Sequence, residues 1–228
     1  MIKAILWDVD GTLLDFLAAE KAALRKCCRI FGIGELTDEM ISRYSAINVK
    51  YWKRLEAGEI DKATVRRGRF IEFFQSEGIE FNEVDALNDE YQIRLGDTIC
   101  FFDDSYEIVK ALRGKVKQYA VTNGTAAAQN IKLKRSGLGE LFDGVFISDD
   151  IGFEKPTVEF FNAVFERIGD IRKDEILIVG DSLTSDMAGG NNAGILCCWY
   201  NRNALPKPDG MRIDHDIRDL HEVLKIIG

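Results

Sequence analysis

The chain has 228 residues, of which 46% are hydrophobic and 30% charged, and its formal net charge is -8. This composition is ordinary for a globular protein with a sizeable core. No block of lysine and arginine is long enough for a nucleic-acid-binding arm, so a nucleic-acid polymer is disfavoured as substrate. A small phosphorylated metabolite in a local basic pocket is compatible with the charge. No run of about 18 apolar residues occurs, and we expect no membrane partner or membrane span.

The cysteines are odd in number and show no CxxC spacing, which favours free, reduced thiols in a cytoplasmic protein. We expect a monomer or a homodimer. The cysteines are Cys27, Cys28, Cys100, Cys197 and Cys198.

The first predicted strand is the mostly apolar run 2–9, which stops at Asp10-Gly11. Runs that are apolar on both faces are typical of strands buried in a parallel sheet. Between the later runs, apolar residues at helical spacing predict helices; one begins at Ala126 and ends at Gly137, which suits a left-handed C-cap. The alternation predicts an α/β fold with a doubly wound sheet. The four later runs are 117–122, 144–148, 175–179 and 195–200.

The stretch 15–99 interrupts this alternation, because it contains no convincing strand. Three helical patterns lie in it, at 17–31, 44–55 and 64–77. We therefore expect a helical module inserted after the first strand. The core would then be discontinuous, formed by 1–14 and 100–228.

Two carboxylates, Asp8 and Asp10, end the first run on a tight Asp-Gly turn. Both can approach one hard cation, and Mg²⁺ prefers oxygen ligands. One carboxylate can attack phosphorus, and the other can protonate the leaving oxygen and later activate water. An ordinary turn is the alternative explanation.

Three further groups follow later runs. Thr122-Asn123-Gly124 can hold phosphate oxygens with a hydroxyl and backbone N–H groups, although Asn-Gly turns are common. Lys155 can neutralise charge on a transferring phosphoryl group, and Pro156 after it suits the first turn of a helix. A surface lysine is the simpler explanation of Lys155 alone.

The fourth group is Gly180-Asp181 with Asp186 five residues on. Asp181 can complete a metal site, and Asp186, in the first turn of the next helix, can accept from Lys155 or a metal-bound water. A helix-start acid is the alternative for Asp186. All four groups end strands of one sheet, where ligands of open parallel sheets bind. Their combination favours a catalytic site.

The sequence is similar to the haloacid dehalogenase-like hydrolase superfamily in these same groups. The resemblance implies a Rossmann-like core, a Mg²⁺ ion and a phosphoaspartate intermediate. It implies that Asp8 is the nucleophile and a metal ligand, and that Asp10 is the general acid/base and offers its backbone carbonyl to the metal. It also implies that Asp181 is a metal ligand, that Lys155 balances charge, and that Thr122 and Asn123 bind phosphate.

The helical module at 15–99 corresponds to the mobile helical cap of this superfamily, which closes over the site. Asp10 favours phosphate-ester chemistry, since true dehalogenases generally lack an acid there. At Asp103-Asp104 the chain departs from many relatives, which have a Pro-Gly pair. The stretches 47–60, 68–70 and 198–201 resemble the pyrimidine 5′-nucleotidase subfamily. That resemblance makes cap residues candidate nucleotide contacts, with cap packing as the alternative: Asn48, Lys50, Trp52 and Arg69.

Several functions stay open at this point. The leading expectation is a phosphomonoesterase acting on a nucleoside 5′-monophosphate. A sugar-phosphate or phosphoglycolate phosphatase and a phosphomutase share the same core. A non-catalytic phosphometabolite-binding regulatory module is a different class, but Asp8 and Lys155 are both present. A response-regulator-like domain also uses Asp, Thr and Lys but lacks such an insertion. The two histidines, His215 and His221, lie outside these groups and are interpreted as surface or packing residues.

Overall fold

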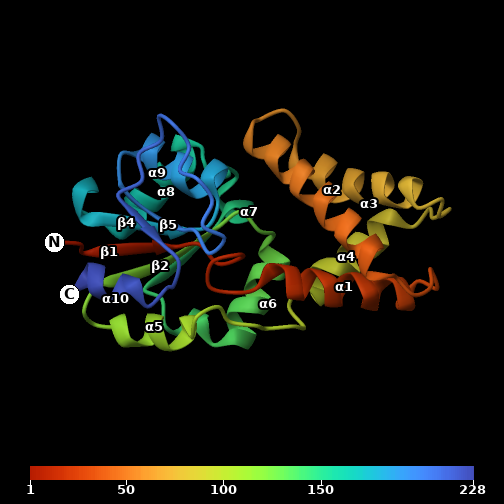
Figure 1. Ribbon diagram of the computed structural model, residues 1–228, viewed down its shortest axis with the longest axis horizontal. Coiled ribbons are helices and arrows are strands. Elements are labelled where there is room, and N and C mark those ends of the chain that lie inside the picture. Colours follow the sequence, from red (N-terminus) through yellow and green to blue (C-terminus); the bar gives the residue numbers. More distant parts are fainter. The chain divides into compact units, whose positions relative to one another are not determined.

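The computed structural model describes residues 1–228, which form two compact units. The sheet unit consists of Met1–Asp15 and Ile99–Gly228, and the helical unit is Phe16–Thr98 (Figure 1). No helix is both long enough and apolar enough to cross a membrane.

The sheet unit contains six strands, all parallel, in the order β3-β2-β1-β4-β5-β6. The central strand β1 pairs with β2 and β4, so Trp7 lies beside Ala120 and Val179. All four residues of β1 are buried, as expected for a strand covered on both faces. The strands are β1 Ala4–Trp7, β2 Lys117–Thr122, β3 Gly144–Ile147, β4 Ile176–Gly180, β5 Leu196–Tyr200 and β6 His215–Ile217.

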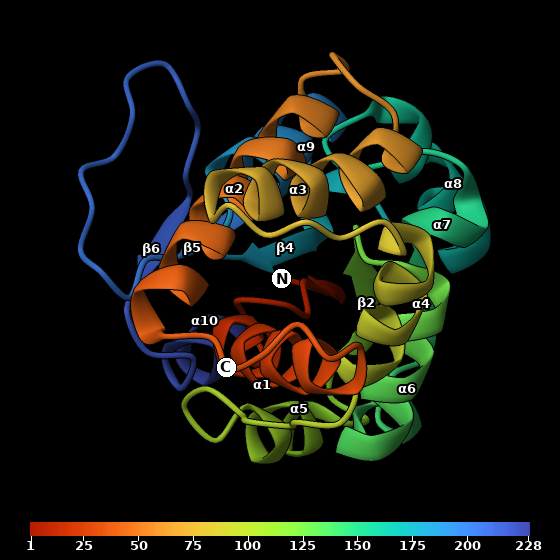
Figure 2. The same ribbon diagram turned by 90° about the vertical axis from the view of Figure 1, so that its right-hand side faces the viewer.

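Helices cover both faces of this sheet (Figures 1 and 2). On one face α5, α6 and α10 pack on Ile5 and Trp7, and on the other α8 and α9 pack on Ala4 and Leu6. These two apolar layers confirm the predicted α/β class. The helices are α5 Ser105–Leu112, α6 Ala126–Ser136, α7 Ser148–Ile151, α8 Val158–Ile168, α9 Ala188–Ala193 and α10 Glu222–Ile227. Short 3₁₀ turns lie at Leu138–Glu140 and Lys173–Glu175, and a π-helical turn at Leu183–Met187 precedes α9.

The helix ends follow their sequence signals in most places. Gly137 ends α6 with a φ of 75°, the left-handed conformation predicted for it. The expectation that Pro156 occupies the first turn of a helix is wrong, because α8 begins at Val158 and Thr157 is its N-cap. The Thr157 hydroxyl accepts from the N–H of Phe160, and this N-cap bond sets the start of the helix after Pro156. Lys155-Pro156, a cis peptide, lies in the loop between α7 and α8.

The helical unit contains four helices and no strand. Aromatic side chains form its interior; Tyr44 lies 5.2 Å from Phe70 and 5.4 Å from Phe73 between ring centroids. The fourth helix was not predicted, because two of its five buried positions, Asn88 and Gln92, are polar. The helices are α1 Phe16–Ile30, α2 Asp38–Glu56, α3 Lys62–Ser76 and α4 Val84–Arg94.

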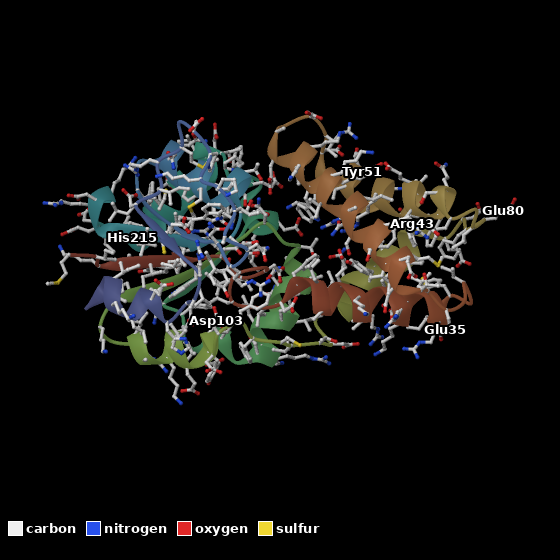
Figure 3. All side chains as sticks on the ribbon, in the orientation of Figure 1. Glu35, Arg43, Tyr51, Glu80, Asp103 and His215 are labelled. Carbon is white, nitrogen blue, oxygen red and sulfur yellow. The ribbon has the colours of Figure 1, made fainter.

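Asp103 and Asp104, which replace a common Pro-Gly pair, both adopt positive φ, at 46° and 54°. Asp is among the residues that tolerate this region. The Asp103 carboxylate, labelled in Figure 3, accepts from the Tyr200 hydroxyl at 2.5 Å and from the Leu220 N–H at 3.1 Å. These bonds attach the turn before α5 to β5 and to the segment before α10.

Candidate active site

The four predicted groups meet at the carboxyl ends of β1, β2 and β4. Asp8 follows β1, Thr122 ends β2, and Asp181 follows β4. The strands are neighbours in the order β2-β1-β4, so their carboxyl ends place these side chains side by side.

Lys155 is at the centre of the site, with only 1% of its surface exposed. Its Nζ lies 2.8 Å from Asp8 Oδ1, 2.7 Å from Asp186 Oδ1 and 2.9 Å from the carbonyl oxygen of Val121. An ammonium has three N–H donors, and each has an acceptor here. Burial alone lowers the pKa of Lys155, but the carboxylates of Asp186 and Asp8 outweigh it and raise that pKa above its ordinary value. Lys155 therefore stays charged.

Asn123 holds the backbone of Lys155 through both ends of its side-chain amide. Asn123 Oδ1 accepts from the Lys155 N–H at 2.8 Å, and Asn123 Nδ2 donates to the Lys155 carbonyl at 2.8 Å. The side-chain amide of Asn123 thus fixes the lysine loop. The hydroxyl of Thr122, which is buried, accepts from the N–H of Gly124 at 3.3 Å. Phosphate binding by Thr122 and Asn123 stays a prediction.

Thr12 links two of the carboxylates from a fully buried position. Its hydroxyl lies 2.9 Å from Asp8 Oδ2 and 3.3 Å from Asp181 Oδ1, and it accepts from the Asp181 N–H at 3.1 Å. The indole N–H of Trp199 donates to the Asp181 carbonyl at 2.9 Å. Neither Thr12 nor Trp199 was assigned a role from the sequence.

Two glycines make room for these carboxylates. Gly11 has a φ of 97°, and a Cβ there would lie 2.7 Å from Asp181 Oδ2. A Cβ on Gly180 would collide with the carboxylate of Asp186. Both positions therefore require glycine for the cluster to form.

The cluster carries more negative than positive charge. Asp8, Asp181 and Asp186 each offer a carboxylate oxygen, and these atoms lie within 4.8 Å of one another. Burial and the neighbouring charge of Asp186 raise the pKa of Asp8 to about 7, although Lys155 acts in the opposite direction. Desolvation by the surrounding atoms and the charge of Asp8 also raise the pKa of Asp181 above its usual range, although much of this residue's surface is exposed. Clustered carboxylate oxygens with too little positive charge fit a hard divalent cation.

Asp10 lies beside this cluster, with its carboxylate bound by two side chains of α6. Lys132 Nζ lies 2.6 Å and 2.7 Å from the two Asp10 oxygens, and Gln129 Nε2 donates to Oδ2 at 2.6 Å. Sequence reasoning missed Gln129 and Lys132. The only feature of the sequence that could have pointed to them is their spacing of three residues, which places both side chains on one face of the helix.

The family model for haloacid dehalogenase-like hydrolases matches residues 2–194. This chain belongs to that family. HAD-hydrolase YfnB of Bacillus subtilis is 36% identical over 226 residues, covering 99% of this chain and 95% of YfnB. A crystal structure of YfnB, bound to magnesium and described as revealing interdomain movement, superposes with a TM-score of 0.93 and covers 100% of this chain and 99% of that one.

Two further relatives of this hydrolase are named as pyrimidine 5′-nucleotidases. PynA of Streptococcus pneumoniae is 33% identical over 97% of this chain and 93% of its own length. YjjG of Escherichia coli is 28% identical over 98% of this chain and 96% of its own. All three relatives match nearly full length, so the likeness includes the helical unit.

The candidate nucleotide contacts of this hydrolase lie in the helical unit. Asn48 is buried there; its Nδ2 donates to Glu20 Oε1 at 2.7 Å, and its Oδ1 accepts from Arg69 at 2.9 Å. Lys50 is exposed and forms an ion pair with Glu72. Trp52 is half-buried and packs on the cluster of Tyr51, Leu55 and Val65. Contacts between these residues and a nucleotide stay a prediction.

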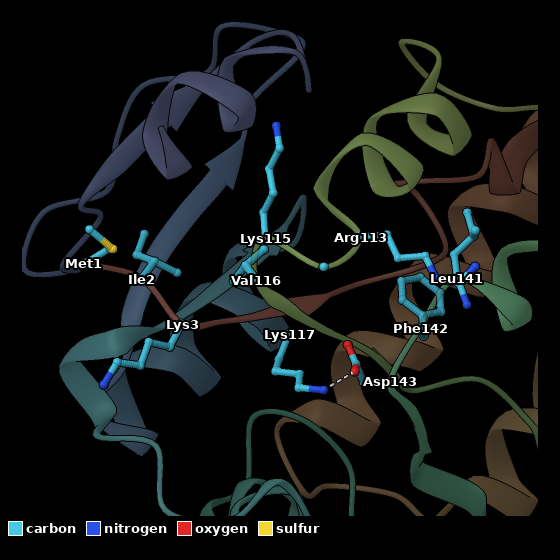
Figure 4. A pocket seen from close by; sticks show the side chains of 11 residues that line it. Met1, Ile2, Lys3, Arg113, Lys115, Val116, Lys117, Leu141, Phe142 and Asp143 are labelled. Carbon is cyan, nitrogen blue, oxygen red and sulfur yellow. Dashed lines mark hydrogen bonds and ion pairs between the residues drawn. The ribbon is translucent and has the colours of Figure 1, made fainter.

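The remaining features of the hydrolase lie away from the carboxyl ends of the strands. A pocket of about 500 Å³ is found at the amino ends of β1 and β2, where Figure 4 shows Lys117 paired with Asp143. None of the predicted catalytic residues lines it. His215 begins β6, and His221 is exposed with its Nδ1 2.7 Å from Asp219.

Proposed function

We propose that this hydrolase is a Mg²⁺-dependent phosphatase that acts on a small phosphorylated metabolite through an aspartyl-phosphate on Asp8. The observation that carries the proposal is the position of Asp8. Its buried carboxylate lies between Lys155 and Thr12, in a cluster with excess negative charge, and a second acid follows two residues later. The magnesium in the YfnB structure supports the choice of cation.

The chemistry needs two steps. An oxygen of Asp8 attacks phosphorus while the bond from phosphorus to the ester oxygen breaks, and Asp10 gives a proton to the departing oxygen. Water then attacks the phosphoaspartate while Asp10 takes its proton, the bond from phosphorus to Asp8 breaks, and phosphate leaves. Lys155 keeps the Asp8 carboxylate in place and offsets charge on the transferring group.

A bound Mg²⁺ would supply positive charge to the transferring phosphoryl group and reduce repulsion between it and Asp8. Asp8 and Asp181 would hold it with side-chain oxygens, and Asp10 with its backbone carbonyl. Asp186 accepts a hydrogen bond from Lys155 and so keeps the lysine ammonium in position beside Asp8, without itself holding the metal.

A nucleoside 5′-monophosphate is our proposed substrate, with pyrimidine nucleotides preferred. The full-length likeness to PynA and YjjG supports this choice. The helical unit would act as a cap that selects the leaving group and limits water at the phosphoaspartate.

The test is phosphate release from UMP, dUMP, dTMP, AMP, GMP, phosphoglycolate and several sugar phosphates, with Mg²⁺ or EDTA. We expect Mg²⁺-dependent release, greatest for pyrimidine nucleotides, and none from D8N. The exposed Asp209 gives a matched control, D209N, which should keep full activity. Release from sugar phosphates alone would retain the chemistry and reject the nucleotidase, and transfer of phosphate within one sugar would indicate a mutase. A folded wild type inactive on every compound would reject the phosphatase in favour of a binding module.

A further inference from the structure

Asp10 is held by side chains that lie outside the four groups of the motif pattern. Lys132 Nζ approaches both carboxylate oxygens, and Gln129 Nε2 approaches Oδ2. We propose that Lys132 and Gln129 are positioning residues that fix the orientation of the Asp10 carboxylate for its proton transfers. This inference rests on the proposed function, in which Asp10 is the acid and then the base.

The contacts restrict the motion of the carboxylate. Both oxygens of Asp10 accept charged or short hydrogen bonds, between 2.6 and 2.7 Å long. Rotation about the Cβ–Cγ bond would break at least one of them, and charge-assisted bonds are the stronger kind. The Asp10 carboxylate is therefore held in one orientation. Proton transfer requires such a fixed position, with the carboxylate within hydrogen-bond distance of the atom that receives or gives the proton.

The burial of Lys132 argues against a role in stability alone. The side chain is only 2% exposed, while that of Asp10 is 19% exposed. Removing an ammonium from water is costly, and a buried ion pair is a poor source of net stability. A lysine at this position is best explained by what it does to the carboxylate.

Gln129 shows two further signs of being placed for Asp10. A Cβ on Gly124 would overlap the Gln129 side chain, so the glycine after Asn123 provides the space that Gln129 occupies. The Oε1 atom of Gln129 is buried without a hydrogen-bond partner. An unsatisfied buried oxygen is costly, yet turning the amide would place that oxygen against the Asp10 carboxylate. The amide orientation therefore follows from the need to donate to Asp10.

The first experiment compares two aryl phosphates that differ in their need for a proton. We would measure kcat/KM with phenyl phosphate and p-nitrophenyl phosphate, because p-nitrophenolate leaves readily without protonation. K132M should lower kcat/KM for phenyl phosphate by about a hundredfold, the lower range for general acid catalysis, and by less than about tenfold for p-nitrophenyl phosphate. Lys134, exposed on the same helix, gives the matched control K134M, which should leave both values unchanged.

A double-mutant cycle with Asp10 shows through which residue Lys132 acts. If Lys132 works by positioning Asp10, then D10N/K132M should be no slower than D10N, so the two losses are strongly non-additive. Equal losses on the two esters, or a further large loss in the D10N background, would overturn the proposal. Wild-type rates in K132M would overturn it as well.

Folding and the proposed function are checked separately. Thermal unfolding establishes that each variant is folded at the assay temperature. Should K132M unfold there, Q129L removes one donor and keeps the lysine, and it should show the same ester dependence at about tenfold size. Turnover of p-nitrophenyl phosphate that D8N abolishes tests the phosphatase itself. With that turnover present, unchanged rates in both K132M and Q129L would reject only the positioning role.

Discussion

Each of the two units contains a cluster of charged side chains that is largely buried, with Asp181 as the exposed member in the sheet unit, and the two clusters differ in their balance of charge. In the sheet unit, Lys155 pairs with Asp8 and Asp186, and a carboxylate oxygen of Asp181 lies within 4.8 Å of theirs, so three carboxylates share one ammonium. The helical-unit cluster consists of Glu20 and Arg69, joined through the amide of Asn48, with Asn88 accepting from Arg69 at 3.1 Å.

The helical-unit cluster has one negative and one positive charge. Arg69 also lies 5.0 Å from the ring centroids of both Phe70 and Tyr91, where a guanidinium is favourably placed. A balanced cluster can persist without a ligand, whereas the cluster of the sheet unit has an excess of negative charge when its three carboxylates are ionised, and it must bind protons or a cation to relieve it. Charge balance thus distinguishes a structural network from a site that fits a cation.

The largest expected effect is that of D8N. We expect phosphatase activity to fall by at least about a thousandfold, because the nucleophile is lost. In EDTA at pH 8, however, the variant should unfold a few degrees above the wild type, since Asn still accepts from Lys155 and removes one repelling charge.

The sign of this stability change depends on pH. Below 3.8, the usual pKa of Asp, the wild-type side chain is neutral in both the folded and the unfolded chain, and D8N gains nothing. Between 3.8 and about 7 the folded protein keeps a proton that the unfolded chain releases, so the wild type loses stability as pH rises. Thermal melts from pH 4 to pH 8 would show this, and a D8N variant that is less stable than wild type at pH 8 would contradict it.

R69M should have the opposite effect on stability. Removing Arg69 leaves Glu20 buried without its counter-charge, and the free energy of unfolding should fall by about 3–5 kcal/mol. Arg67 lies on the same helix as Arg69 and forms an exposed ion pair with Asp85 of α4 at 3.1 Å, so R67M is the control and should cost less than about 1 kcal/mol.

Chemical denaturation measures both changes. The double variant R69M/E20Q should recover part of the loss, because it removes the unpaired charge. If R69M were as stable as wild type but raised KM for a nucleotide, Arg69 would be a substrate contact and the comparison of the two clusters would fail.

T12V tests how the cluster of the sheet unit is held together. The Thr12 hydroxyl donates to Asp8 and accepts a hydrogen bond from the Asp181 N–H. Valine has nearly the same shape as threonine but cannot form these bonds. Mg²⁺ affinity should fall by about tenfold to a hundredfold, the usual effect of losing a partner behind metal ligands. Isothermal titration calorimetry measures it, and an unchanged affinity would mean that Thr12 only packs.

Much of the fold could be predicted because strands buried on both faces are mostly apolar and end at turn residues; β2 has the predicted bounds, 117–122. The strand β6 could not be, since it has three residues, of which only Ile217 is apolar and buried. In the site, the close approach of Asp8 and Lys155 could be predicted because the segments that follow parallel strands meet at one edge of the sheet, while their catalytic roles stay predictions. Lys132 was missed because a lysine in a helix normally faces solvent, and nothing in its sequence neighbours shows that it is buried.

The smallest expected effect is on the pH dependence of Mg²⁺ affinity. Burial and Asp186 raise the pKa of Asp8 to about 7 in the metal-free protein, so a proton competes with the cation for this carboxylate. Below that pH the apparent affinity should weaken by about tenfold per unit, and above it the affinity should level off. Calorimetry at pH 6 and pH 8 in two buffers of different ionisation enthalpy would show more protons released at pH 6 than at pH 8, with Asp8 alone contributing close to one at pH 6. R67M, which alters only a surface pair of the helical unit, gives the control and should leave this profile unchanged. Equal Mg²⁺ affinity at pH 6 and pH 8 would mean that the negative charge of Asp8 is balanced without a cation. The two clusters would then differ only in how their substitutions change the stability of the protein.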